Sequence, residues 1–284
     1  MQNAIRRIEI KTKRLSQNIF AGQYHSAFRG RGMSFAEVRE YQYGDDVRDI
    51  DWNVTARFNR PYVKIFEEER ELTVMLLIDV SGSLDFGTRG ESKRQIMAEI
   101  AATLAFSAIF NNDKIGVIFF SNEIEKYIPP KKGKRHILHI IKELTEYEPK
   151  HKLTDIGKAV GFLNRVVKRR CTTFLISDFY DLNDYERELA LCSKKHDTIA
   201  IQLYDVFAKQ LPDVGLLMVS DAETGKEILI DTSDSRLRHK YAADWIDKQV
   251  TLKNIFKNCR VDNVSIATNE DFVVPLLNLF KQRA

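Results

Sequence analysis

From residue 72 onward, short apolar runs alternate with longer amphipathic runs. The apolar runs are six residues each and lie at 73–78, 115–120, 172–177 and 198–203. They lack the polar alternation of a half-buried strand, so they are typical of parallel strands covered on both faces. Helical periodicity separates them and lies at about 92–110, 134–147, 155–169 and 235–258. This alternation predicts an α/β fold with a doubly wound, mostly parallel sheet.

Shorter features complete this pattern. Residues 124–128 predict a short strand that ends at Pro129-Pro130. A β-hairpin insertion is predicted near 213–232, because two short apolar runs there flank the polar turn 221–226. A last strand at 263–267 and a short final helix end the chain.

Residues 1–70 have much charge and little long-range periodicity. We predict that they form an N-terminal arm packed on a main domain of residues 71–284. Within the arm, Ser34-Phe35-Ala36-Glu37 has the form of a capping box and predicts a short helix. Residues 62–68 alternate as a strand does, and Tyr43-Gly44-Asp45-Asp46 predicts a turn.

Composition narrows the class of protein. The chain of 284 residues is 30% charged and 44% hydrophobic, as folded globular chains are, and its net charge of +4 is mild. It contains neither a run of ~20 apolar residues nor a signal peptide. Its three cysteines are odd in number and far apart, which fits a reducing cytosol and excludes a disulfide framework. We therefore expect a cytoplasmic protein. The basic residues near the N-terminus are interpreted as a solvated helix face rather than a nucleic-acid site; they are Arg6, Arg7, Lys11, Lys13 and Arg14.

Oxygen-bearing side chains follow two of the predicted central strands. Asp79, Ser81 and Ser83 come directly after the first apolar run, and Asp178 follows the third. Thr154 lies in a loop that leads into a predicted helix. The carboxyl ends of parallel strands lie at one edge of a sheet, where ligands bind. Carboxylates and hydroxyls are hard ligands of the kind Mg²⁺ prefers. The ordinary alternative is that they are turn and helix-cap residues, with Asp178 capping a helix near Asp184.

In order and chemistry, these five residues resemble the metal ion-dependent adhesion site of von Willebrand factor type A domains. The resemblance implies a Rossmann-type fold that holds Mg²⁺ or Mn²⁺. The two serines and the threonine would bind the ion directly or through water, and the two aspartates largely through water. A Glu or Asp of a partner protein would fill the open position. The family usually has small residues before the threonine, whereas this chain has Lys152-Leu153, so the affinity for the ion is left open.

A second resemblance covers nearly the whole chain and rests on motifs that precede Asp79 in unbroken order. They are Gly30-Arg31-Gly32, Phe35, Arg39-Glu40-Tyr41, Gly44-Asp45-Asp46-Val47-Arg48, Ile50-Asp51-Trp52 and Thr55-Ala56-Arg57. Together they resemble the signature of the bacterial family catalogued as domain of unknown function 58. This resemblance implies a partner of MoxR-type AAA+ ATPases, of the short kind without membrane spans. Docking at the inner membrane through a partner stays open.

The functional interpretation is a non-catalytic, metal-dependent protein-interaction module that works with a MoxR-type AAA+ ATPase on an acidic client. The alternative is a Mg²⁺-dependent phosphohydrolase in which Asp79 attacks phosphate. Such enzymes typically carry a second Asp two residues later as the general acid, and Ser81 stands there instead. His136 and His139 have a spacing that two zinc ligands could share, but no third ligand is evident nearby, and nothing orders a His and a Cys into a dyad.

Overall fold

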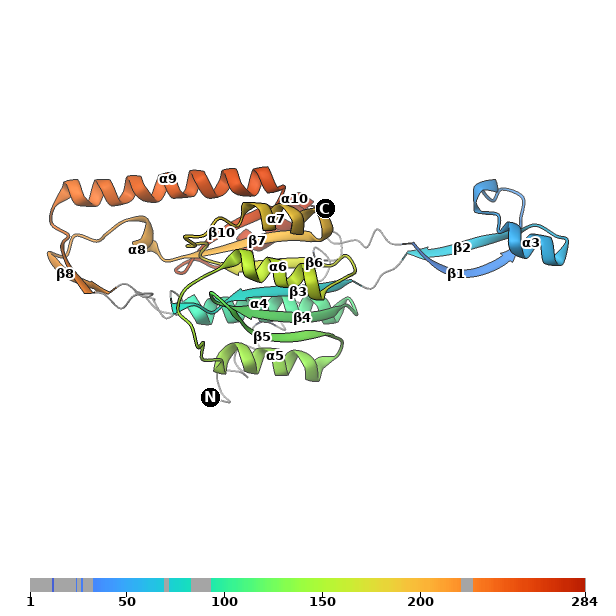
Figure 1. Ribbon diagram of the computed structural model, residues 1–284, viewed down its shortest axis with the longest axis horizontal. Coiled ribbons are helices and arrows are strands. Elements are labelled where there is room, and N and C mark those ends of the chain that lie inside the picture. The colour runs from blue at the N-terminus through green and yellow to red at the C-terminus, as the bar shows by residue number, and fades with distance from the viewer. Residues whose placement is uncertain are drawn as a thin grey trace. The chain divides into compact units, whose positions relative to one another are not determined.

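A computed structural model of the chain describes residues 12, 24, 27, 33–68, 72–82, 93–220 and 227–283 (Figure 1). The chain divides into two compact units. The larger unit comprises Met1–Phe28 and Thr73–Ala284, and the smaller comprises Arg29–Leu72.

A six-stranded sheet forms the centre of the larger unit. Its strands, in spatial order, are β10 (Asp262–Ala267), β7 (Asp197–Tyr204), β6 (Thr172–Ser177), β3 (Thr73–Asp79), β4 (Lys114–Phe120) and β5 (Ile124–Lys131). All neighbours are parallel except β4 and β5. The predicted α/β class and mostly parallel sheet are therefore confirmed. Strand order reverses between β3 and β6, and ligands of doubly wound sheets bind at the carboxyl ends of such a pair.

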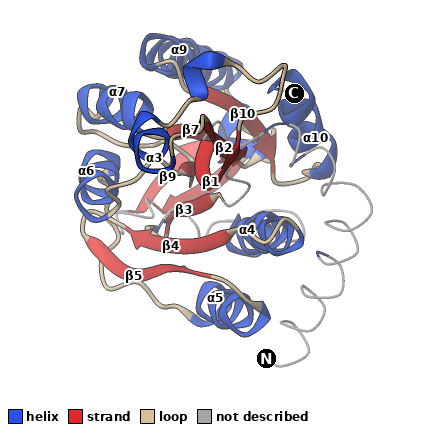
Figure 2. Ribbon diagram, turned by 90° about the vertical axis from the view of Figure 1, so that its right-hand side faces the viewer, coloured by secondary structure: helices blue, strands red, loops and turns tan. Residues whose placement is uncertain are grey.

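The helices of the larger unit cover both faces of this sheet. In Figure 2, α4, α5 and α10 lie on one face and α6, α7 and α9 on the other. The helices are α4 (Lys93–Phe110), α5 (Lys134–Glu146), α6 (Ile156–Val166), α7 (Glu186–Lys195), α8 (Val206–Lys209), α9 (Ser235–Cys259) and α10 (Val273–Arg283). Coverage on both faces explains the unbroken apolar runs, since every residue of β6 is buried. None of the helices in the described part of the chain combines the length and apolar character that a membrane span requires.

The edge strand β5 differs from its prediction. The expected end at Ile128 was wrong, because the strand continues through Pro129 and Pro130 to Lys131. An edge strand tolerates proline because one side has no ladder to complete. Gly116 of β4 permits the close approach, since a Cβ there would lie 2.8 Å from both the Ile128 carbonyl oxygen and the Pro130 nitrogen.

The predicted β-hairpin strands pair as β8 (Leu216–Ser220) and β9 (Glu227–Asp231), which are antiparallel. Beyond β9, the buried Thr232 closes the base of this pair. Its hydroxyl accepts from the Val214 amide at 3.0 Å and donates to the Gly215 carbonyl at 2.6 Å.

The smaller unit is a strand pair with two short helices. Strand β1 (Met33–Glu40) pairs antiparallel with β2 (Tyr62–Glu68), and η2 (Val47–Asp49) and α3 (Trp52–Phe58) lie between them in sequence. The helix predicted at residues 34–37 was wrong, since this segment lies within β1. Pairing with residues some thirty positions away outweighs the local capping signal.

Local ion pairs stabilise the turn after β1. Arg39 donates to both carboxylate oxygens of Asp45, at 2.7 and 2.8 Å. This pair and the amide of Gln42 lower the pKa of Asp45 below its usual range. Asp46 and Asp51 cap η2 and α3, which gives the acidic residues of the sequence signature a structural role within the unit.

Candidate metal centre

The predicted metal ligands come from three segments at the carboxyl edge of the sheet. Asp79 ends β3, Asp178 directly follows β6, and Thr154 precedes α6. The Gly82 amide donates to the Lys152 carbonyl at 3.0 Å, which joins the loop after β3 to the loop that carries Thr154. Ser83 lies outside the described residues.

Asp79 is fully buried and held on both carboxylate oxygens. The Ser81 amide donates to Oδ1 at 2.9 Å, and the Ser177 hydroxyl donates to Oδ2 at 2.6 Å. Burial, and secondly the charge of Asp178, raise the pKa of Asp79 to about 7. Without a cation, the ionised form of Asp79 is therefore disfavoured, and a positive charge nearby would restore it. Ser177 was not among the predicted site residues.

Thr154 provides the test of whether this edge fits a metal ion. Thr154 is only 6% exposed, and its Oγ1 has no hydrogen-bond partner among the described residues. A buried hydroxyl without a partner costs about 1–3 kcal/mol, so native proteins rarely keep one without a reason. An oxygen that lacks a partner, in a loop tied to the end of β3, suits a hard cation.

Among the described residues, the Asp178 side chain makes two polar contacts, and neither is a helix cap. One carboxylate oxygen accepts from the Tyr180 amide at 3.1 Å, and the other lies 3.1 Å from the Lys93 ammonium. The alternative in which Asp178 caps the next helix is wrong, because α7 begins at Glu186 and its first turn bonds Asp184.

The backbone beside Asp178 is strained. Phe179 has a φ of 59°, in the left-handed region that costs a non-glycine residue on the order of 1 kcal/mol or more. Packing of its ring on Phe256, with ring centroids 5.0 Å apart, and a bond from its amide to Ser177 hold it there. Backbone strain of this kind clusters at functional sites.

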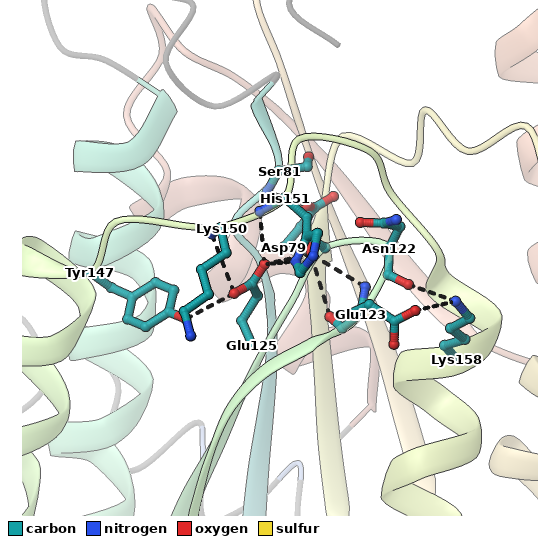
Figure 3. A network of polar contacts seen from close by, with 10 residues as sticks. Asp79, Ser81, Asn122, Glu123, Glu125, Tyr147, Lys150, His151 and Lys158 are labelled. Atoms are coloured by element: carbon teal, nitrogen blue, oxygen red, sulfur yellow. Dashed lines mark hydrogen bonds and ion pairs between the residues drawn. The ribbon is translucent and has the colours of Figure 1, made fainter.

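A second polar cluster centres on Glu125 of β5 and forms hydrogen bonds to the loop that leads to Thr154 (Figure 3). The Glu125 side chain is 1% exposed. Its carboxylate accepts from Ser121 Oγ at 2.8 Å, Tyr147 Oη at 3.0 Å, the His151 amide at 3.1 Å and His151 Nδ1 at 2.9 Å. Burial alone would raise the pKa of Glu125, but these donors hold it at about 2. The cluster fixes the chain three residues ahead of Thr154.

The loop is also fixed directly after Thr154. The Asp155 amide donates to the Ser121 carbonyl at 3.0 Å. The Asp155 side chain caps α6 by accepting from the Lys158 amide at 2.7 Å. Asp155 is therefore the N-cap residue of α6.

The histidines and cysteines form no metal site in the described part of the chain. No three His, Cys, Asp or Glu side chains there lie close enough together to hold a metal ion. His136 Nε2 bonds the Ile115 carbonyl at 2.9 Å, as a structural histidine does. The expectation that no His and Cys are paired was wrong, since Cys171 Sγ lies 3.2 Å from His196 Nδ1. Burial raises the pKa of Cys171 to about 12 and lowers that of His196 to about 4, so both are neutral and the thiol is inert.

Comparison with known proteins finds a family and a fold. The model of the family described as "Protein of unknown function DUF58" matches residues 37–251. An uncharacterized protein of Mycobacterium tuberculosis is 29% identical over 284 residues, which is 99% of this chain and 89% of the relative. The solved structure of an aerotolerance-related membrane protein from Bacteroides fragilis is similar in fold, with 15% identity, a TM-score of 0.50, and coverage of 75% of this chain and 98% of that one. The VWA domain of SpRpn10 matches with 12% identity and a TM-score of 0.42, over 75% of this chain and 95% of that domain.

Proposed function

The chain belongs to the DUF58 family of proteins of unknown function, and from that premise we propose that it is a non-catalytic protein-interaction module with a divalent cation. The cation, Mg²⁺ or Mn²⁺, would lie at the carboxyl ends of β3 and β6. Its ligands would be Asp79, Ser81, Thr154 and Asp178, together with Ser83 on sequence grounds. The ion supplies an electrophilic position that a carboxylate of a partner protein can complete.

The observation that carries this proposal is the buried Thr154 hydroxyl, which has no hydrogen-bond partner within the described part of the chain and lies in a loop bonded to the end of β3. Supporting evidence comes from Asp79, whose raised pKa marks a buried carboxylate in need of positive charge. The set contains few anionic groups and several hydroxyls. An ion held in this way keeps much of its affinity for an external carboxylate, as capture of an acidic partner requires.

The proposed partner is a MoxR-type AAA+ ATPase, with which the chain would recognise or deliver a client for assembly or remodelling. Support for this partner comes from the resemblance of the signature in residues 30–57. The ATPase would supply the energy, so this chain needs no catalytic base. The proposed location is the cytoplasm, with any membrane contact made through partners.

The geometry disfavours the alternative phosphohydrolase. Both Asp79 oxygens accept hydrogen bonds, which lowers their nucleophilicity. Ser81 cannot serve as the general acid at neutral pH.

The test is metal-gated capture of a defined partner. Tagged protein is incubated with the purified MoxR-type ATPase of the same organism, in Mg²⁺ and in EDTA, and an Asp79→Asn variant is run alongside. Retention only by the wild type in Mg²⁺ is the expected result. Retention that ignores both the metal and the substitution would refute the metal-dependent interface. Titration calorimetry with Mn²⁺ separately tests whether the ion binds at all.

A further inference from the structure

The candidate metal centre contains a positively charged side chain, that of Lys93. Lys93, the first described residue of α4, places its Nζ 3.1 Å from Asp178 Oδ2. The side chains of Lys93 and Asp178 are 9% and 11% exposed, so the pair is almost entirely out of water. It joins two segments 85 residues apart in the sequence.

Burial does not favour a lysine at this position. A buried ammonium loses its hydration, which is tolerated only with a compensating anion. Asp178 is the anion that the structure provides, and it is also a proposed metal ligand. The same carboxylate would therefore serve both the lysine and the metal ion.

We propose that Lys93 competes with the divalent ion for Asp178 and thereby makes metal binding depend on the partner's carboxylate. This inference rests on the proposed metal site and deepens it. When Asp79 and Asp178 are ionised, one divalent ion neutralises them. The Lys93 ammonium then leaves one positive charge in excess, which one external carboxylate balances. Lys93 thus weakens binding of the ion alone and favours binding of the ion together with an acidic group.

The experiment measures Mn²⁺ affinity by titration calorimetry with and without acetate as the carboxylate probe, at ionic strength matched with sodium chloride. The proteins are the wild type, Lys93→Met and Lys195→Met. Lys195, the last residue of α7, is a matched control, because carbonyl oxygens hold its Nζ at 2.7 and 2.8 Å. The expected result for Lys93→Met is Mn²⁺ affinity on the order of tenfold or more tighter than wild type, because the competing charge is gone. Acetate should tighten Mn²⁺ binding by the wild type and by Lys195→Met, but not by Lys93→Met.

The possible failures are distinguishable. If the wild type binds Mn²⁺ and Lys93→Met binds it equally or more weakly, the metal site stands and the role of Lys93 is refuted. If neither protein binds Mn²⁺, with or without acetate, the metal site itself is refuted. Circular dichroism checks the fold of each variant. If Lys93→Met does not fold, Lys93→Gln replaces it, because this variant removes the charge but keeps a hydrogen-bond donor for Asp178. Lys93→Gln must then show the same increase in Mn²⁺ affinity.

Discussion

The most direct test of the candidate metal centre is Thr154→Val, which replaces a hydroxyl by a methyl group of similar size. In an ordinary buried site this change removes a hydrogen bond and destabilises the protein. Here Oγ1 has no partner among the described residues and Thr154 is 6% exposed. Removing an unsatisfied buried hydroxyl should therefore stabilise the metal-free protein by about 1 kcal/mol. For a unit of this size, that corresponds to a rise in Tm of about 2–4 °C.

The assay is thermal unfolding followed by circular dichroism, in EDTA and in 10 mM Mg²⁺. Wild-type Tm should rise in Mg²⁺, because a ligand that binds only the native state stabilises it. Thr154→Val should start from a higher Tm in EDTA and gain little from Mg²⁺. Thr154→Ser, which keeps the hydroxyl, is the matched control and should retain the response to Mg²⁺. A lower Tm for Thr154→Val in EDTA would refute the reasoning, since it would mean that the hydroxyl is already paired.

Three further predictions concern the charged and titratable groups. Because the pKa of Asp79 is raised to about 7 from an unfolded value near 3.8, the metal-free protein should lose on the order of 2–4 kcal/mol of stability between pH 4 and 7. Asp79→Asn should flatten this profile in urea titrations, and an unchanged slope would contradict the assignment. Glu125→Gln should destabilise the larger unit by about 2–4 kcal/mol at pH 7 and weaken Mn²⁺ binding. The substitution replaces one carboxylate oxygen, which accepts from His151 or Tyr147, by an amide NH2 group, which can only donate. A folded variant with wild-type affinity for Mn²⁺ would show that the cluster does not position the loop. Cys171 should resist iodoacetamide at pH 8 until the protein unfolds, as mass spectrometry would report, because burial raises its pKa to about 12; rapid labelling of the native protein would contradict this.

The sheet could be predicted because its central strands are covered on both faces. Burial on both faces leaves an unbroken apolar run, and β3 and β6 each have one. The same argument located Asp79 and Asp178, since a residue directly after such a run lies at the carboxyl edge. Prediction failed at β1, where a local capping pattern competes with pairing to a distant strand. Local signals identify a segment's own preference but not its partner.

The residues that sequence reasoning missed depend on contacts between distant segments. Lys93 and Asp178 are 85 residues apart, and Glu125 and His151 are 26 residues apart. A lysine at the start of a helix and a glutamate in an edge strand are ordinary in sequence. Only burial distinguishes them, because a charge removed from water must find its partner within the protein.

Hydrogen bonds within the chain shape the candidate metal centre. Backbone bonds from Gly82 to Lys152 and from Asp155 to Ser121 fix the described parts of the two loops, and the Ser177 hydroxyl holds Asp79. Ordering these segments should therefore cost little free energy when an ion or a partner binds. The free-energy cost falls on the metal-free protein, in the buried Asp79 and in the Thr154 hydroxyl, which has no partner among the residues that the structure describes. Such a cost is expected where groups are kept for binding rather than for stability, and it explains why replacing them should stabilise the protein while abolishing capture.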